Sequence, residues 1–317
     1  MYFGLKMVLV FIKRYGIGIY MANQSTYFLV GVDGGGTGCR VAIASMAGER
    51  LGEAIGGPAN YTTDPDLAIR SVRAAIEVAA DNAGLESIWV EQSTAHLGLA
   101  GIMSPEDASI VKSAMPFSRT AVSDDRATSV AGALGDRDGM LAALGTGTIV
   151  AGQKNGSTRF FGGWGHQLAD QASGGWLGRR ALRRTMLAFD GLTTPSSLTH
   201  ALLAQFNDSP TEMIAFANKA GPGDFASLAR IIIEAAQGGD DTGQSLMRDG
   251  ANYLCRCIEE LNLGEDAVLC LAGGVGPHYA PYLPKAYRDR IRPAYGTAVD
   301  GALALARQAL EKREGIE

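Results

Sequence analysis

Apolar and polar positions along the chain predict a strand, a glycine turn and a second strand near the start. Residues 27–32 form a continuous apolar run, Asp33 and three glycines interrupt it, and apolar residues return at 41–45. This pattern is typical of two strands joined by a tight turn. A further strand near 51–55, a helix from Pro65 to Gly84, a strand at 93–99, a helix from Pro105 and a strand at 119–122 are expected to follow.

The same pattern returns in the middle of the chain. Residues 140–161 contain an apolar run, the turn Gly145-Thr146-Gly147-Thr148, a second apolar run, and the hairpin pair Asn155-Gly156 before a third strand. The first copy has Asp33 before its glycines, whereas the second has Leu144. We therefore interpret the chain as duplicated, with the charge kept in one copy.

The remainder is predominantly helical by its periodicity. A capping box is expected at Ser209 and Glu212, and a strand at 267–272 precedes Gly273-Gly274-Val275-Gly276. The expected helices are 174–189, 196–206, 224–237, 240–261 and 297–312.

Composition narrows the possible classes of function. The 317 residues exceed the size that one core usually fills, and 46% hydrophobic with 19% charged residues is typical of a globular chain. A net charge of −5 argues against nucleic acid as a partner. The four cysteines show no C-x-x-C spacing, so we expect free thiols without a zinc site or a disulfide framework.

The first residues are apolar enough to resemble a targeting segment. Lys13 and Arg14 interrupt the run, which stays below the roughly 18 residues that a membrane span needs. Met21 opens a sequence typical of a cytoplasmic protein, so residues 1–20 are expected to be an upstream extension of the reading frame or a loose tail. The expected location is the cytoplasm, without a membrane partner.

The two glycine turns are candidates for phosphate binding. Their backbone N–H groups can surround phosphate oxygens because glycine accepts positive φ and leaves no side chain in the way, and Thr37 and Thr148 can add hydroxyl donors. The Walker motif G-x-x-x-x-G-K-[ST] does not occur in the chain. The turns are also not G-x-G-x-x-G motifs, because these glycines lead into a second strand instead of a helix. One such turn is usually an ordinary hairpin, but two matched copies favour phosphate binding.

Acidic residues end two of the expected strands. Asp33 could simply form a turn, yet it lies where a Mg²⁺ held by one carboxylate and the phosphates would sit. One of Asp124 and Asp125 is expected to cap the following helix. The other is placed to accept a proton from a hydroxyl that attacks a phosphoryl group.

Seven motifs follow one another along the chain: Asp33–Thr37, Gly98–Gly101, Asp124-Asp125, Gly145–Thr148, Gly162–His166, Asp170–Ser173 and Gly273–Gly276. Together, in this order, they resemble the N-acetylglucosamine kinase and glucosamine kinase family. That family belongs to the BadF/BadG/BcrA/BcrD-type ATPase group within the sugar kinase/Hsp70/actin superfamily. The resemblance implies an α/β chain with two ribonuclease-H-like (actin-like ATPase) domains flanking a cleft for ATP and sugar. It also implies a final helix that returns to the first domain. We expect an extension or tail at 1–26, a first domain at 27–134 completed by the helix 297–313, and a second domain at 135–296 with a helical insert.

The resemblance also implies roles for single residues. The helix register at Ser129–Ala133 favours Asp125 over Asp124 as the catalytic base, and Asp33 is the expected Mg²⁺ ligand. The expected ATP contacts are Asp33, Gly34, Gly35, Gly36, Thr37, Gly145, Thr146, Gly147, Thr148, Gly273, Gly274 and Val275. The expected sugar contacts are Asn60, Gly101, Asp125, Thr146, Trp164 and Asp170.

The implied reaction is ATP-dependent phosphorylation of an amino sugar at the 6-hydroxyl. Trp164 could instead be a core aromatic, and His166 is expected to be structural. Two departures leave the identity of the sugar open: Gln171 stands where the family commonly has an acid, and Ala100 where it commonly has serine.

Other functions were weighed against the kinase. An activator ATPase would need cysteines for an iron–sulfur cluster, whereas Cys255 and Cys257 lie within a helical pattern. A sugar-sensing regulator would need a DNA-binding segment, for which the 26 residues before Tyr27 are too few and too apolar. The partners expected are therefore ATP and a small amino sugar. Homodimers are common in families of this kind.

Overall fold

The computed structural model describes residues 10–13, 16–19, 27–85 and 87–315. Within the expected extension, β1 (Val10–Lys13) and β2 (Gly16–Ile19) pair as an antiparallel hairpin. This hairpin was not expected from the sequence, which predicted an extension or a loose tail here. Within the described residues, no helix is both long and apolar enough to span a bilayer.

The first sheet has five strands in the order β5-β4-β3-β6-β7. β3 is antiparallel to β4 and parallel to β6, and β6 is parallel to β7. The carboxyl ends of β3, β6 and β7 therefore meet at one edge, which is where open α/β sheets bind ligands. The bounds are β3 Phe28–Gly34, β4 Cys39–Ser45, β5 Arg50–Gly56, β6 Ser93–Leu99 and β7 Arg119–Ser123.

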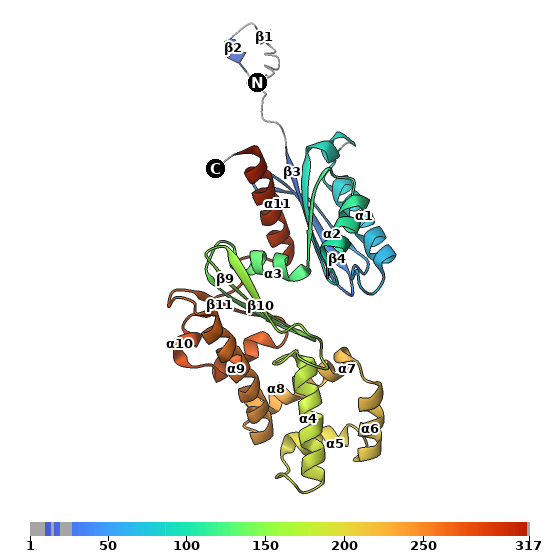
Figure 1. The fold of residues 1–317 in the computed structure, drawn as a ribbon, viewed down its shortest axis with the longest axis vertical. Helices are drawn as coiled ribbons and strands as arrows, with labels where there is room; N and C mark the ends of the chain where they lie inside the picture. Colours follow the sequence, from blue (N-terminus) through green and yellow to red (C-terminus); the bar gives the residue numbers. More distant parts are fainter. Residues whose placement is uncertain (1–9, 14–15, 20–26, 86, 316–317) are drawn as a thin grey trace.

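Helices cover both faces of this sheet (Figure 1). α1 (Pro65–Asn82) and α2 (Pro105–Ala114) lie on one face, and α11 (Ala298–Glu314) packs on the other, while the short η1 (Ser87–Gln92) precedes β6. Alternating residues of β3 feed the two cores, because successive side chains of a strand point to opposite faces. α11 approaches β3 so closely that a Cβ on Gly31 would lie 2.8 Å from the Val299 carbonyl oxygen.

The second sheet repeats the strand-turn-strand pattern of the first. Its order is β10-β9-β8-β11, with β8 parallel to β11 and the other pairs antiparallel. The duplication that the hydrophobic pattern predicted is therefore present in three dimensions. The bounds are β8 Gly139–Leu144, β9 Thr148–Lys154, β10 Ser157–Phe161 and β11 Val268–Ala272.

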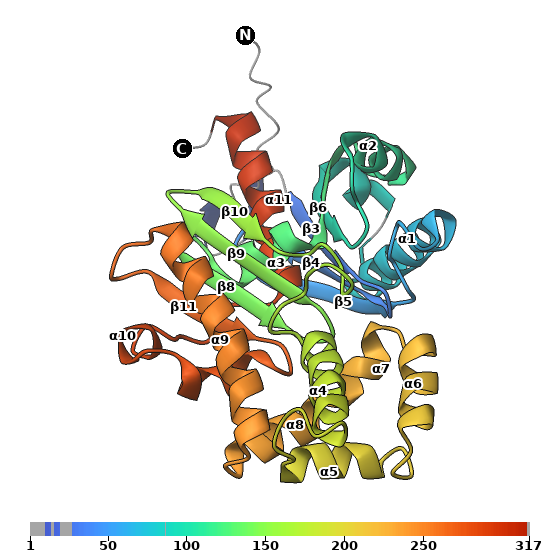
Figure 2. The same ribbon diagram turned by 60° about the horizontal axis from the view of Figure 1, so that its bottom comes forward.

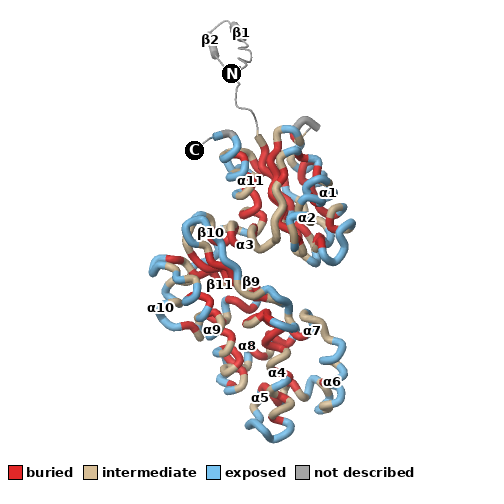
Figure 3. Tube along the Cα trace, viewed as in Figure 1, coloured by how far each residue is buried: buried red, intermediate tan, exposed pale blue. Residues whose placement is uncertain are grey.

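Most of the remaining helices pack chiefly on one another below the second sheet (Figure 2). Buried residues follow the strands and the helix faces that meet them (Figure 3). α3 (Asp125–Leu134) lies between the two sheets, where Val130 and Leu134 pack with Leu141 of β8. The other elements are α4 Gly174–Phe189, α5 Ser197–Ala204, α6 Pro210–Lys219, α7 Pro222–Ser227, α8 Ala229–Gln237, α9 Asp241–Leu261, η2 Gly276–Tyr282 and α10 Lys285–Arg288.

Two local predictions need correction. The helix expected at 224–237 is broken at Leu228, whose N–H bonds the Phe225 carbonyl at 3.1 Å in a tightened last turn. The capping box before α6 is only half formed: the Ser209 hydroxyl accepts from the Glu212 N–H, but the Glu212 carboxylate accepts from the Asn207 side chain instead. The predicted α/β class with two sheets is confirmed, while the exact domain boundaries stay a prediction.

Candidate active site

The first glycine turn leaves the carboxyl end of β3. It is closed by the Gly35 N–H, which donates to the Gly38 carbonyl at 2.9 Å. A Cβ on Gly34 would lie 2.5 Å from the Leu99 side chain, so this glycine is required for packing. A Cβ on Gly36 would meet nothing within 4 Å. The outer face of the turn is therefore open to a ligand, as phosphate binding through backbone N–H groups requires.

The second glycine turn joins β8 to β9 and is anchored to the start of α4. The Gly174 N–H donates to the Gly145 carbonyl at 2.7 Å, and the Gly175 N–H donates to the Thr146 carbonyl at 3.2 Å. Thr148 is buried, and its hydroxyl donates to the Gln171 carbonyl at 2.7 Å. This hydroxyl is used inside the fold, so Thr148 shapes the turn and its predicted phosphate contact is not supported.

A third glycine turn follows β11 and lies against the second. Gly273 has a φ of +77°, and its Cα faces the Leu144 carbonyl so closely that no Cβ would fit. The Val275 N–H donates to the same carbonyl at 2.9 Å. β8 and β11 are parallel, so both turns leave the same edge of the sheet.

These two turns form one wall of a cavity of about 570 Å³. It brings together Gly145, Thr146, Gly274 and Val275, which the sequence analysis assigned to ATP. The rest of the lining comes from α4, α7, α8 and η2, and the α8 and η2 residues were not assigned to the site from the sequence. The only available signal was helical spacing, because Arg230, Glu234 and Gln237 recur at i, i+4 and i+7. The newly found lining side chains are Arg230, Ile233, Glu234, Gln237 and His278.

Three carboxylates gather at the carboxyl edge of the first sheet. Asp124 caps α3, since its Oδ1 accepts from the Arg126 N–H at 2.9 Å and from the Arg126 Nε at 2.6 Å. Asp125 lies in the first turn of the same helix. Burial, followed by repulsion from Asp124 and from Asp33, raises the pKa of Asp125 to about 6. A pKa close to neutrality suits a general base.

Asp33 is the second-last residue of β3, directly before the first glycine turn. Burial raises its pKa, and the Arg40 guanidinium, 3.5 Å from Oδ2, opposes the shift. Within the described residues, no three side chains of the His, Cys, Asp and Glu types form a metal site. The one carboxylate nevertheless fits the expected Mg²⁺, which takes most of its ligands from phosphates and water.

Asn60 and Gly101 face each other in neighbouring loops. The Asn60 Oδ1 accepts from the Thr63 N–H at 3.1 Å, which leaves the amide nitrogen to face a ligand. Gly101 has a φ of +83°, and a Cβ on it would lie 2.6 Å from that oxygen. Both loops are joined to the first glycine turn, through Ala59 N–H to the Gly35 carbonyl at 2.9 Å and Ala100 N–H to the Gly34 carbonyl at 2.8 Å. The predicted sugar and phosphate residues of this domain therefore form one hydrogen-bonded unit.

The loop between β10 and α4 carries the remaining predicted residues. Asp170 adopts a φ of +60°, a strained value for a residue with a side chain, and it is buried beside the second glycine turn. Burial raises its pKa, opposed by the Thr148 N–H and by the charges of His166 and Arg179. Trp164 is 76% exposed, which rules out a core role for its ring.

Arg126 connects this loop to the carboxylates. Its guanidinium stacks over the Phe160 ring at 4.8 Å, and a Cβ on Gly163 would lie 3.5 Å from its Nη1. The residue next to Asp125 thus contacts the strand and the loop of the second half of the chain. The four cysteines are free, and Cys255 and Cys257 lie within α9 as the sequence predicted.

Known proteins resemble this chain over most of its length. The model of the BadF/BadG/BcrA/BcrD ATPase family matches residues 30–300. A glucosamine kinase of Vibrio cholerae serotype O1 is 29% identical over 88% of this chain and 95% of its own length. An N-acetylmuramic acid/N-acetylglucosamine kinase of Clostridium acetobutylicum is 27% identical over 78% of this chain and 85% of its own.

A crystal structure gives a further match. It is of a Chromobacterium violaceum protein proposed to be an N-acetylglucosamine kinase, which is 33% identical. The match covers 89% of this chain and 100% of that chain, with a TM-score of 0.77. The fold class and the family resemblance predicted from the sequence are thereby confirmed.

Proposed function

The chain belongs to the BadF/BadG/BcrA/BcrD ATPase family, and from this premise we propose that it transfers the γ-phosphoryl group of ATP to the 6-hydroxyl of an amino sugar, N-acetylglucosamine or glucosamine. The observation that carries the proposal is the position of Asp125. Its carboxyl is partly buried, has a pKa raised to about 6, and is close enough to Asp33, which precedes the open first glycine turn, for the two charges to repel. The named relatives are kinases of glucosamine, N-acetylmuramic acid or N-acetylglucosamine.

In the proposed reaction, Asp125 orients the sugar hydroxyl and accepts its proton as the oxygen attacks the γ-phosphorus. The bond from the γ-phosphorus to the bridging oxygen of ADP breaks in the same step. The open glycine turns hold the phosphates in line through their backbone N–H groups, and the adenosine occupies the cavity beside α8. Asp33 would hold Mg²⁺, which supplies charge neutralisation at the phosphates.

The sugar would be bound by residues from both halves of the chain. The Asn60 amide can donate to a ring hydroxyl, and the Asp170 carboxylate can accept from two hydroxyls. Trp164 remains a proposed contact of the sugar. Gln171 is a neutral amide where the family commonly has a carboxylate. We expect this difference to affect which substituent at carbon 2 of the sugar is preferred, and a panel of sugars measures that preference.

The test is ADP release with Mg²⁺-ATP against N-acetylglucosamine, glucosamine, N-acetylmannosamine, glucose and no sugar. Strong stimulation of ADP release by one amino sugar over the sugar-free reaction supports the proposal. The sugar with the highest rate shows which substituent at carbon 2 a site with Gln171 accepts. Phosphorus NMR of the product then identifies the phosphorylated hydroxyl. If every sugar matches the blank, the amino-sugar kinase proposal is rejected.

A further inference from the structure

A second, smaller pocket lies at the opposite edge of the first sheet from the carboxylates. It has a volume of about 170 Å³, well above what one water molecule needs, and is lined by residues of β6, α2, β7 and α11. Thr94 and Arg119 stand at the amino ends of β6 and β7, where they are paired in register. The carboxylates lie at the carboxyl ends of the same sheet, so this pocket is separate from the candidate active site.

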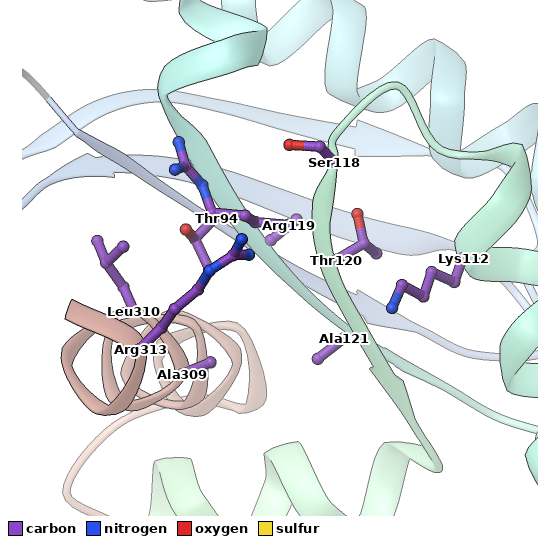
Figure 4. A pocket seen from close by; sticks show the side chains of 10 residues that line it. Thr94, Lys112, Ser118, Arg119, Thr120, Ala121, Ala309, Leu310 and Arg313 are labelled. Carbon is purple, nitrogen blue, oxygen red and sulfur yellow. The ribbon is translucent and has the colours of Figure 1, made fainter. Parts of the chain in front are cut away.

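Three cations line this pocket without a carboxylate. They are Lys112 in the last turn of α2, Arg119 at the start of β7 and Arg313 in the last turn of α11. Within the described residues none of the three forms an ion pair, although the chain as a whole carries a net charge of −5. Figure 4 shows the Arg313 guanidinium reaching from α11 toward Thr94 and the Arg119 side chain.

Arg119 is held in place by the surrounding chain. Its Nη2 donates to the Glu91 carbonyl at 2.6 Å and its Nε to the Ser93 carbonyl at 3.3 Å, while the guanidinium stacks over the Tyr27 ring at 5.1 Å. A fixed cation loses little side-chain entropy when a ligand binds. Lys112 and Arg313 are exposed and can close on the ligand.

Thr94 supplies an independent observation. The residue is 4% exposed, and its hydroxyl has no hydrogen-bond partner among the described residues. The neighbouring Thr120 hydroxyl does find one, since it donates to the Phe117 carbonyl at 2.9 Å. A buried hydroxyl without a partner destabilises a fold, and an acceptor in the pocket would remove that cost.

We propose that this pocket binds a phosphate group. A tetrahedral oxyanion can accept from the Thr94 hydroxyl and from cations that approach from different directions, and guanidinium groups suit its geometry. The partial negative charges at the ends of α2 and α11 oppose an anion, but each amounts to only about half a charge against three cations. The group can come from inorganic phosphate or from a phosphorylated metabolite.

The test is a titration of the full chain at constant ionic strength, followed by thermal unfolding and calorimetry. Saturating Mg²⁺-ADP is present, so that the glycine turns are occupied. Inorganic phosphate and glucose 6-phosphate are titrated separately, with chloride as the control salt. We expect at least one of the two to raise the unfolding temperature. The Arg313→Gln variant should bind about tenfold more weakly, while Lys312→Gln, its neighbour in the same helix turn and outside the pocket, should bind as the wild type does.

Thr94→Val separates a ligand role from a structural one. Removing an unpartnered hydroxyl should leave the unliganded protein as stable as the wild type or more stable, yet weaken phosphate binding severalfold. The proposal is overturned if neither phosphate compound stabilises the wild type, if Arg313→Gln and Lys312→Gln respond equally, or if Thr94→Val binds phosphate unchanged.

Discussion

Asp124 and Asp125 are adjacent in the chain, yet their carboxylates have different environments. The Asp124 Oδ1 is engaged by both the backbone N–H and the Nε of Arg126, at 2.9 and 2.6 Å. Asp125 lies partly buried in the first helical turn, with a pKa raised to about 6. The cap thus holds one acid in place and leaves its neighbour to act on a proton.

Asp125→Asn should abolish sugar phosphorylation almost completely. An amide cannot accept the proton, and loss of a general base typically lowers kcat by about 10²–10⁴-fold. ATP affinity should be nearly unchanged, because the glycine turns are intact. Steady-state kinetics and a nucleotide-binding assay measure the two effects separately.

Asp124→Asn is the matched control for this substitution. Asparagine caps helices about as well as aspartate, so α3 should remain formed. The variant should retain activity within about tenfold of the wild type. If Asp124→Asn loses activity and Asp125→Asn keeps it, the roles of the two acids are reversed.

Activity should fall at acidic pH from an unusually high value. The base must be ionised, and Asp125 becomes protonated as the pH drops through its pKa of about 6. We expect kcat/KM to decrease about tenfold per pH unit below this point. In Asp124→Asn one of the repelling charges is gone, so the acidic limb should move to lower pH. An acidic limb that begins near pH 4 in the wild type would contradict the raised pKa.

Asp125→Asn should also stabilise the unliganded protein at neutral pH. The pKa of Asp125 is higher in the folded chain than its ordinary value of 3.8, so the cost of this carboxyl to folding builds up between about pH 4 and pH 6 and is fully present above pH 6. The substitution should raise the free energy of unfolding by about 1–3 kcal/mol at pH 7.5, with a smaller gain at pH 5. Urea denaturation at the two pH values measures the difference, and an equal effect at both would show that the charge is not responsible.

Much of the candidate site was predictable because its signals are local. A strand that ends in Asp33 and glycines is readable from a few residues, and the parallel strands then bring their ends together. The choice between Asp124 and Asp125 could be narrowed by helix register, but their environments depend on Arg126 and on Asp33, which is distant in the chain.

Other features depend on contacts that a local pattern does not contain. The part of the cavity lining on α8 depends on the fold, which brings this helix to the same cavity as the turns after β8 and β11. The Thr148 hydroxyl was expected from the sequence to donate to phosphate, but it donates to the Gln171 carbonyl. The break at Leu228 falls within an uninterrupted helical pattern, and only the tightened turn to Phe225 reveals it.

Gly101→Ala should weaken sugar binding without changing the KM for ATP. The new Cβ would lie 2.6 Å from the Asn60 Oδ1 at a φ of +83°, so the asparagine must move. Gly48→Ala is the control, because its φ of +87° is similar and its nearest atom is the end of a long side chain, Arg307 Nη2 at 3.5 Å. Gly48→Ala should lose about 1 kcal/mol of stability, and Gly101→Ala should lose more, because its Cβ would also lie 2.5 Å from the Thr62 backbone nitrogen. Only Gly101→Ala should raise the KM for the sugar severalfold. Equal sugar KM values would remove Asn60 from the sugar site.

The third glycine turn offers a pair of neighbours that separates folding from nucleotide binding. Gly273 combines a φ of +77° with a close approach to the Leu144 carbonyl, so Gly273→Ala should destabilise the fold by several kcal/mol. A Cβ on Gly274 meets nothing within 4 Å, yet it points into space beside the cavity that this glycine lines. Gly274→Ala should therefore unfold like the wild type and raise the KM for ATP about tenfold, with little change in the KM for the sugar. A Gly274→Ala variant with wild-type ATP kinetics would contradict adenosine binding against this part of the cavity wall.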